Sequence, residues 1–327
     1  MDFLRSSFRH LPRLALPCAL ALAACRTGTG PQNSFTHPSG QVRTRSAALT
    51  GRPFGVAVTR SEAILVGLQD EDRLAVLPLA DSPPLGSIDV GAVPTDVRLS
   101  PDGGLAAVSN QFSGSVGFVD MASARQVAAV PTSAAPFRVL FSPDGRRVYA
   151  SNNSGMVDIL DVSSRSWIGG VQAGSASNGL AISPDGLSLY VTSMSGGVTV
   201  VDLGANRVAR SIPLAGMPQG IVVSPDGRQL FVAREAATAI AVLDASSGVQ
   251  TDSILVGSGS FDLALTPDGV QLFASFPSAG LVVVIDRASR RVVQTLAVGG
   301  APRRIAFTPT GDAAAVGNES GWVDIIR

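Results

Sequence analysis

The tetrapeptide Ser100-Pro101-Asp102-Gly103 recurs along this chain at a nearly constant spacing. Later copies begin at residues 142, 183 and 224, and altered copies begin at 266 (Thr-Pro-Asp-Gly) and 308 (Thr-Pro-Thr-Gly), so that successive copies are 41 or 42 residues apart. A repeat of about 40–45 residues with strand-like flanks is typical of the blades of a β-propeller. The spacing predicts the fold, but it does not predict the function, because one scaffold can carry many activities.

One repeat unit shows how the strands are arranged around this turn. Residues 94–99 and 105–109 flank the tetrapeptide, and residues 115–119 and 125–130 complete the unit. Short runs rich in β-branched residues, separated by Gly, Pro, Asn and Asp, are typical of antiparallel strands. In the turn, proline presets φ near −65° and glycine accepts the left-handed conformation that follows. Each unit therefore predicts a four-stranded antiparallel blade.

A second series of residues supports this register. An aspartate ends the third strand of five successive units. We expect each of them to cap the turn that follows, because an Asp side chain there accepts hydrogen bonds from the backbone N–H groups just after it. Repetition at one structural position favours this role over catalysis. The residues are Asp120, Asp161, Asp202, Asp244 and Asp286.

The ends of the chain predict how the ring closes. A degenerate first unit, with Gly51-Arg52-Pro53 before its first strand and residues 59–62 in place of the tetrapeptide, brings the number of turns to seven. The last unit stops after a third strand at residues 321–326. We expect residues 41–48 to supply the missing fourth strand, which would join both ends of the chain in one sheet and close the ring without a broken inner interface. Residues 41–327 are thus predicted to form an all-β, seven-bladed propeller closed by an N-terminal strand.

The N-terminus has the features of a secretion signal. Residues 1–24 combine Arg5, Arg9 and Arg13 with an apolar stretch at 14–24, which is shorter than the roughly 20 residues that span a bilayer. The stretch ends Leu22-Ala23-Ala24-Cys25, which resembles the lipobox of bacterial lipoproteins. An ordinary signal peptide with an incidental cysteine is the alternative interpretation.

The lipobox resemblance implies cleavage before Cys25 and acylation of that residue. Residues 25–40 contain mainly Gly, Pro, Ser, Thr and other polar residues, which predicts a flexible tether. We therefore expect a protein of the cell envelope, anchored through lipid to the membrane, on the outer-membrane or periplasmic side and not in the cytoplasm.

Composition narrows the chemistry of the predicted propeller. The charges of the whole chain balance, with 25 basic residues, all Arg, against 25 acidic ones, so no nucleic-acid partner is expected. The two cysteines, Cys18 and Cys25, and the two histidines, His10 and His37, all precede residue 41. A Ser-His-Asp triad, thiolate chemistry and His-ligated metals are therefore excluded. The acidic run at 69–72 lacks the spacing of a calcium loop. We expect no catalytic residue, no metal, no cofactor and a monomer.

A resemblance to known repeats agrees with this fold. Tyr190-Val191-Thr192-Ser193 closely resembles the motif that names the YVTN β-propeller repeats of bacteria and archaea, and looser copies lie at 148–152 and 231–233. The resemblance extends over about residues 50–327; the related TolB-type repeat also carries the tetrapeptide. Such repeats occur in surface proteins, binding modules and relatives of lactonases. A lactonase-like or other hydrolase using the central channel therefore stays an alternative, as does a sensor of small anions.

Strand parity indicates where a binding site would lie. The loops between second and third strands share one face, here called the top face, with the links between blades; the tetrapeptide turns lie on the opposite, bottom face. The turns repeat, whereas the top loops differ from copy to copy, as a binding surface requires, although drift in unconstrained loops is an alternative.

The starts of the innermost strands should bring a set of charged and aromatic residues to one rim of the channel. We predict that they bind an unknown protein or small ligand, so that the propeller is a non-catalytic scaffold; mutual neutralisation of their charges is the alternative. The predicted residues are Phe54, Asp96, Arg138, Asp262, Arg303 and Arg304.

Overall fold

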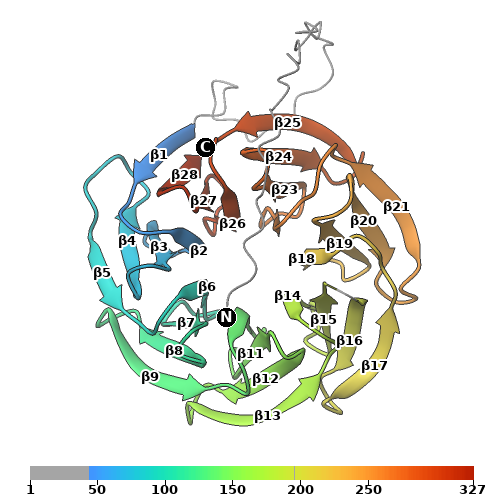
Figure 1. Cartoon of the computed structure of the whole chain (residues 1–327), viewed down its shortest axis with the longest axis horizontal. Helices are drawn as coiled ribbons and strands as arrows, with labels where there is room; N and C mark the ends of the chain where they lie inside the picture. Colours follow the sequence, from blue (N-terminus) through green and yellow to red (C-terminus); the bar gives the residue numbers. More distant parts are fainter. Residues whose placement is uncertain (1–43, 195) are drawn as a thin grey trace, which may run out of the picture. The chain divides into compact units, whose positions relative to one another are not determined.

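Each tetrapeptide turn joins the innermost strand of a blade to the second, and the strands then step outward from the central channel (Figure 1). The computed structural model describes residues 44–194 and 196–327. Within these residues, 28 strands form seven four-stranded antiparallel sheets arranged in a ring. This confirms the seven-bladed propeller. The predicted signal peptide at 1–24, Cys25, the tether at 25–40 and residues 41–43 lie outside the described residues.

Blades 1 to 4 follow the order of the chain. Blade 1 contains β2 (Pro53–Val58), β3 (Ala63–Leu68), β4 (Arg73–Pro78) and β5 (Gly86–Asp89). Blade 2 contains β6 (Pro94–Leu99), β7 (Leu105–Asn110), β8 (Ser115–Asp120) and β9 (Arg125–Pro131). Blade 3 contains β10 (Pro136–Phe141), β11 (Arg147–Asn152), β12 (Met156–Asp161) and β13 (Ser166–Gln172). Blade 4 contains β14 (Ser177–Ile182), β15 (Ser188–Ser193), β16 (Gly197–Asp202) and β17 (Arg207–Ile212).

Blades 5 and 6 continue this order, and blade 7 joins the two ends of the propeller. Blade 5 contains β18 (Pro218–Val223), β19 (Gln229–Arg234), β20 (Ala239–Asp244) and β21 (Gln250–Leu255). Blade 6 contains β22 (Leu263–Leu265), β23 (Gln271–Phe276), β24 (Leu281–Asp286) and β25 (Arg291–Ala297). Blade 7 contains β26 (Pro302–Phe307), β27 (Ala314–Asn318), β28 (Trp322–Ile326) and, as its outer strand, β1 (Thr44–Ala48).

The closure of the ring occurs as the sequence predicts. β1 pairs antiparallel with β28, with Thr44 opposite Ile326 and Ala48 opposite Trp322. The ladder is extended by the Leu49 N–H, which donates to the Gly321 carbonyl at 2.8 Å. The first described strand therefore covers the edge that the last strand would otherwise expose.

The five tetrapeptide turns that contain aspartate share one hydrogen-bond arrangement, which explains why their sequence recurs. In the turn of blade 2, the Ser100 hydroxyl donates to the Asp102 carboxylate at 2.5 Å and accepts from the Leu105 N–H at 2.9 Å. The Asp102 carboxylate also accepts from the Gly104 N–H at 3.0 Å, and Gly103 adopts a φ of 76°. Such a φ favours glycine, because a Cβ is strained there.

The core consists of separate apolar clusters where neighbouring blades face each other. One such cluster joins blades 7 and 1 and contains Val56, Ala315 and Val323, all fully buried or nearly so.

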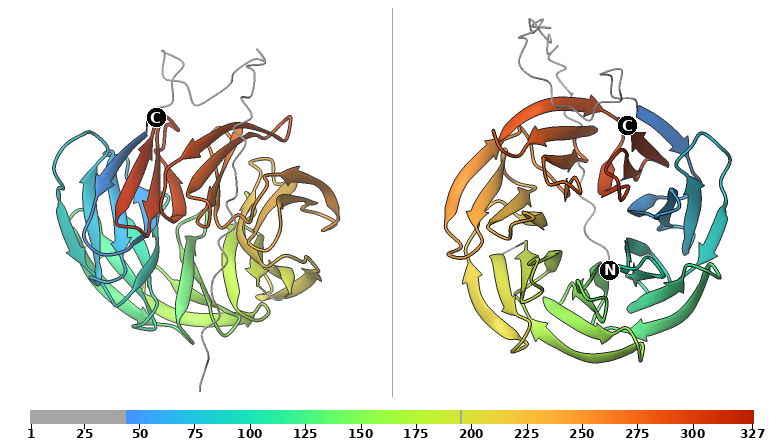
Figure 2. Two further views of the ribbon diagram at one scale, coloured as in Figure 1. Left: turned by 45° about the horizontal axis from the view of Figure 1, so that its top comes forward. Right: turned by 180° about the vertical axis from the view of Figure 1, so that it is seen from behind.

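The ring is shown tilted and from behind in Figure 2. No helix long and apolar enough to cross a bilayer occurs between residues 44 and 194 or between 196 and 327.

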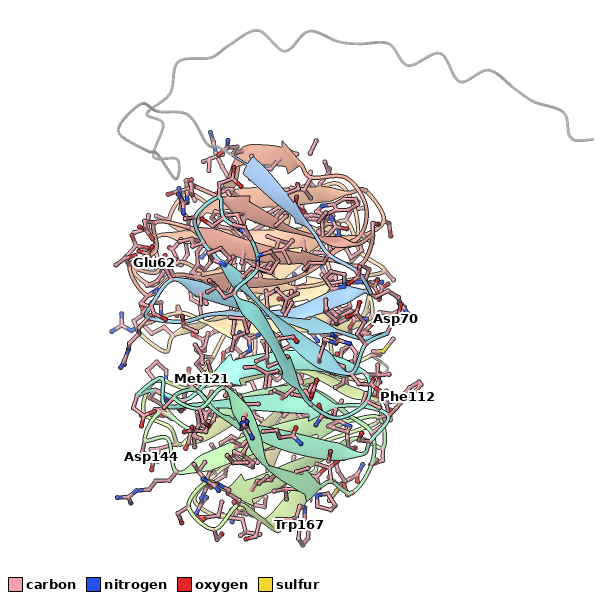
Figure 3. All side chains as sticks on the ribbon, turned by 90° about the vertical axis from the view of Figure 1, so that its left-hand side faces the viewer. Glu62, Asp70, Phe112, Met121, Asp144 and Trp167 are labelled. Carbon is pink, nitrogen blue, oxygen red and sulfur yellow. The ribbon has the colours of Figure 1, made fainter. Side chains whose placement is uncertain are left out.

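The two faces of the ring carry different loops, as strand parity predicts. Asp70 and Phe112, in loops between second and third strands, lie on one side of the molecule in Figure 3, and Glu62, Met121 and Asp144, in turns, lie on the other. These are the top and the bottom face, respectively. The innermost strands run from top to bottom, so their first residues lie near the top face.

Candidate functional site

The third residue of each innermost segment forms a ring around the channel with an unusual composition. Three members are glycines, two are aspartates and two are arginines: Gly55, Asp96, Arg138, Gly179, Gly220, Asp262 and Arg304. The glycines permit neighbouring segments to approach closely. A Cβ on Gly179 would lie 2.2 Å from the Gln219 carbonyl oxygen, and one on Gly220 would lie 2.9 Å from the Asp262 Cα.

The four charged members of this ring form a buried ion-pair network across the channel. Arg138 Nη1 donates to Asp262 Oδ1 at 2.7 Å, and Arg138 Nε lies 3.8 Å from Asp96 Oδ2. Arg304 Nη1 also reaches Asp262 Oδ1, at 3.4 Å. None of the four side chains is more than 5% exposed. The network therefore links blades 2 and 3 to blades 6 and 7 through the interior. We call it the channel network.

Both aspartates of the channel network also hold the backbone of the next blade. Asp96 Oδ2 accepts from the Val139 N–H at 3.2 Å, and Asp262 Oδ2 accepts from the Ile305 N–H at 3.1 Å. The same arrangement is thus built twice, each time between an aspartate and the following innermost strand. Charge-assisted bonds of this kind are stronger than bonds between neutral groups.

The pKa values of the network reflect burial and charge acting together. Burial raises the pKa of Asp262, but the neighbouring charges of Arg138, Arg304 and Arg98 outweigh it and leave that pKa below its usual range. Burial lowers the pKa of Arg138, whereas Asp262 and Asp96 more than offset this effect. For Arg304, burial and the charge of Arg138 dominate, and its pKa is lowered. Asp262 therefore stays an anion at neutral pH and is unsuited to donate a proton.

Three phenylalanines surround Arg304 on the side of the top face, and we call them the aromatic collar: Phe54, Phe137 and Phe261. Phe54 packs edge-to-face against each of the other two, with ring centroids 5.9 Å apart in both pairs. The Arg304 guanidinium carbon lies 5.6, 5.0 and 5.1 Å from the three centroids. Cation–π contact compensates in part for Arg304 Nε and Nη2, which have no hydrogen-bond partner.

Arg303 lies over the aromatic collar and is more accessible than Arg304. Its guanidinium carbon is 4.8 Å from the Phe261 centroid, and its Nη2 pairs with Glu319 Oε2 at 2.5 Å. The side chain is 24% exposed. Glu319 also accepts a hydrogen bond of 2.6 Å from Arg52, so one carboxylate bridges two arginines at the rim of the channel.

The six predicted site residues are brought together, but their environment differs from the one expected. They share one level of the channel, as their positions at the strand starts predict. The alternative that opposite charges neutralise each other agrees with the ion pairs of Asp96, Arg138, Asp262 and Arg304. The pairs are buried, however, and do not lie on an exposed rim, because the third residue of each segment points into the channel. Their role in binding, and that of Phe54 and Arg303, stays a prediction.

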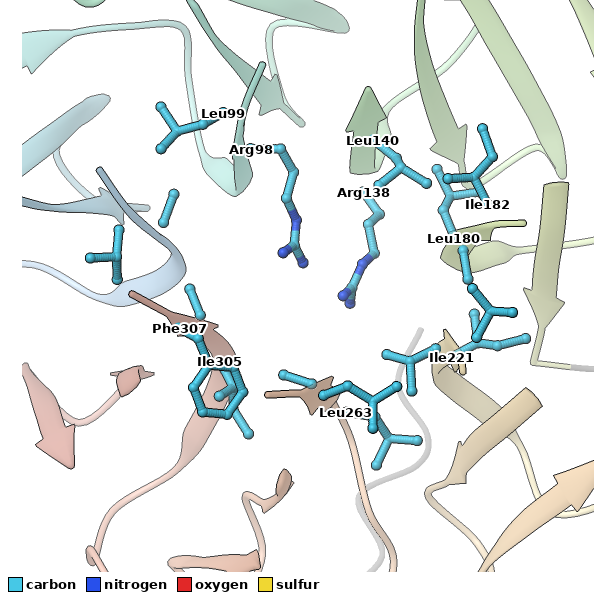
Figure 4. A pocket seen from close by; sticks show the side chains of 18 residues that line it. Arg98, Leu99, Arg138, Leu140, Leu180, Ile182, Ile221, Leu263, Ile305 and Phe307 are labelled. Atoms are coloured by element: carbon cyan, nitrogen blue, oxygen red, sulfur yellow. The ribbon is translucent and has the colours of Figure 1, made fainter. Parts of the chain in front are cut away.

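A cavity occupies the lower part of the channel, beneath the channel network. Its volume is about 480 Å³. Of its 18 lining residues, Arg98 and Arg138 are charged and the remainder are Ala, Val, Leu, Ile or Phe. Figure 4 shows the two guanidinium groups reaching into the open centre of the channel from neighbouring blades.

Arg98 was not singled out from the sequence, although a signal exists. It is the fifth residue of its innermost strand, where the other blades carry only small or apolar residues: Ala57, Leu140, Ala181, Val222, Ala264 and Ala306. A single cationic residue at a position that is apolar in every other blade is a sequence signal for a functional residue. Between residues 44 and 327, leaving aside the undescribed residue 195, no group of three or more His, Cys, Asp or Glu side chains is placed to hold a metal ion.

The comparisons with known proteins agree with the architecture. The chain is a seven-bladed β-propeller, and it is similar in fold to a chain of hydrazine synthase from Kuenenia stuttgartiensis, with a TM-score of 0.76 and 18% sequence identity. The match covers 85% of this chain and 96% of the other. No family model and no curated protein sequence matches the chain. At this identity the likeness shows the fold alone.

Proposed function

We propose that this protein is a non-catalytic binding scaffold of the cell envelope, held to the membrane as a monomer through a lipid on Cys25, with its top face as the surface for a protein partner. The scaffold itself is a rigid ring, because buried ion pairs and an N-terminal strand join its blades internally. The repeated turns occupy the bottom face, which leaves the variable loops of the top face for recognition.

The observation that carries this proposal is the rim formed by Arg303, Arg52 and Glu319. The guanidinium of Arg303 is held in place by two rings of the aromatic collar and by Glu319, yet a quarter of its side chain stays accessible. Phe112, in the top loop of blade 2, is 79% exposed. Arginine is among the residues that most often dominate protein interfaces, and a side chain that is already held in place loses less freedom on binding.

Capture of a partner from solubilised membranes by the full chain tests the site. Arg303→Ala should lower the recovery of a captured partner by about tenfold, since hot-spot truncations typically cost more than 1 kcal/mol. Asp144→Ala, on the bottom face, should leave recovery unchanged. Equal recovery of the partner with both variants, at wild-type melting temperature, would remove the top-face site.

Metabolic labelling with a palmitate analogue tests the anchor. Lipoprotein processing requires the Cys25 thiol, so Cys25→Ser should abolish the label and release the protein from the membrane fraction. Multiple acyl chains give stable anchoring, whereas a single chain gives only marginal binding. Equal labelling of wild type and variant would contradict the lipid anchor.

A further inference from the structure

The topology indicates from which face of the ring a molecule would enter the cavity beneath the channel network. Its walls come from the second halves of the innermost strands, such as Leu140, Ile182 and Phe307, which lead into the turns of the bottom face. Toward the top face it is bounded by the buried side chains of the channel network and, above them, by the aromatic collar. A small molecule would therefore enter from the bottom face, away from the rim of the proposed partner site.

The charges around this cavity do not balance. Among the described residues, the guanidiniums of Arg98, Arg138 and Arg304 face only two carboxylates, those of Asp96 and Asp262. One positive charge is therefore left over, and none of the three arginine side chains is more than 26% exposed. A buried charge without a counter-charge is costly, and an anion of single charge in the cavity would offset that cost.

Arg98 is the group positioned to meet such an anion. Its Nε lies 3.4 Å from Asp96 Oδ2, a long contact on the side of the network. Its two terminal Nη groups have no hydrogen-bond partner among residues 44–194 and 196–327. The side chain is 26% exposed and points into the open centre of the cavity in Figure 4. A guanidinium presented in this way matches the two oxygens of a carboxylate.

The rest of the wall selects for an apolar body. Sixteen of the eighteen lining residues carry only hydrocarbon side chains. A cavity of about 480 Å³ lies in the usual range of small-ligand sites, which combine apolar walls with a few polar groups that fix orientation. A dianion such as phosphate would bring a second charge against these walls, whereas a carboxylate attached to a hydrocarbon chain matches both features.

We propose that the lower channel binds a small monocarboxylate with an apolar body, of the class of medium-chain fatty acids, with its carboxylate on Arg98 and its chain against the apolar walls. This site goes beyond the proposed partner surface and lies on the other side of the channel network from it. Arg138 Nη1 is already bound to Asp262, so Arg138 contributes a positive electrostatic potential near the carboxylate. Arg98 donates the hydrogen bonds to it.

Calorimetric titration of the full chain with octanoate tests the site. Octanoate should bind with one molecule per chain. 1-Octanol and octylammonium should bind at least tenfold more weakly, because the alcohol carries no negative charge and the ammonium carries the same charge as the guanidinium. Arg98→Gln should weaken octanoate binding by at least tenfold. Arg291→Gln, the same substitution at an exposed arginine on β25, should leave it unchanged.

A second variant reduces the volume of the cavity and keeps all of its charged side chains. Ala264 lines the wall and is only partly covered, so Ala264→Leu should fill part of the volume and also weaken octanoate binding. If Arg98→Gln does not fold, octanoate binding by Ala264→Leu tests the proposed site. Arg303→Ala should bind octanoate like the wild type, which separates this site from the partner surface. Three results would overturn the proposal: absence of octanoate binding by the wild type, wild-type affinity for octanoate in both Arg98→Gln and Ala264→Leu, or binding of 1-octanol as tight as that of octanoate.

Discussion

Arg138 of blade 3 donates a 2.7 Å hydrogen bond to Asp262, at the start of the innermost segment of blade 6, and so joins two residues 124 positions apart in the chain across the central channel. Most contacts in this ring connect a blade only to its neighbours, as in other repeat architectures. This pair instead ties together blades that are not adjacent. Since both side chains are buried, the bond contributes to holding the ring at one diameter, and it separates the top rim from the cavity below.

Breaking this pair should destabilise the fold strongly. Arg138→Met keeps much of the side-chain volume but leaves Asp96 and Asp262 buried with less compensating charge. We expect a loss of about 3 kcal/mol in the free energy of unfolding, measured with urea at pH 7. The matched control is Arg290→Met, which removes the more exposed pair with Asp252 and should cost far less, because solvent screens an exposed ion pair. Similar losses in both variants would show that the Arg138 pair has no special structural role.

The glycines at the same level of the channel should not tolerate a larger side chain. In Gly179→Ala the new Cβ would meet the Gln219 carbonyl oxygen at 2.2 Å and the Thr192 hydroxyl at 2.8 Å. Strands β14 and β18 would have to move apart, so we expect a loss of about 2 kcal/mol in unfolding free energy. Gly204→Ala is the control, because its nearest neighbour atom is 3.4 Å away and its φ is ordinary. That variant should stay within about 0.5 kcal/mol of wild type, and a neutral Gly179→Ala would refute the close-approach explanation.

The N-terminal strand should be required for closure. Deleting residues 41–49 removes β1, its ladder with β28, and Ala47 and Leu49, which pack against the cluster between blades 7 and 1. We expect the melting temperature to fall by roughly 5–10 °C and amide exchange in β28 to accelerate, since about 1 kcal/mol corresponds to roughly 2–4 °C in a domain of this size. Deleting residues 32–38, within the predicted tether, should leave both quantities unchanged. Identical melting of the two deletions and the wild type would contradict closure by β1.

Acid should weaken the turns between third and fourth strands. The Ser164 N–H and the Ser163 and Ser164 hydroxyls lower the pKa of Asp161 to about 2, and the hydroxyl of Ser246 and the N–H of Ser247 do the same for Asp244. Because the folded-state pKa lies below the unfolded one, the stabilisation is present above about pH 4 and is lost as the pH falls toward 2. The melting temperature should therefore drop over this interval.

Substitution by asparagine isolates this effect. Asp161→Asn with Asp244→Asn keeps an oxygen that accepts the N–H bonds but removes the titrating carboxylates, so the dependence of the melting temperature on pH between 4 and 2 should become shallower than in the wild type. An unchanged slope would show that other groups govern the acid response. The exposed outer-strand variant Arg291→Gln serves as the control and should keep the wild-type slope.

Much of the architecture could be predicted because its causes are local. The turn at Ser100–Gly103 depends on a hydroxyl, a proline, a carboxylate and a glycine that are adjacent in the chain, and its repetition counts the blades. The unfinished last unit likewise predicts that β1 completes blade 7. Strand alternation places Asp96, Arg138, Asp262 and Arg304 at one level of the channel, so the sequence also predicts that these residues meet.

The sequence by itself therefore determined the number of blades, the way the ring closes, the identity of its two faces and the residues that gather at the head of the channel. Only the tertiary structure decided that Arg138 reaches Asp262 across the ring, that Arg304 lies inside the aromatic collar, and that Arg98 faces a cavity with an unbalanced charge. The physical reason is that turns and strand alternation act over a few residues. Burial, pairing and excess charge depend on the width of the channel, which all seven innermost strands set together.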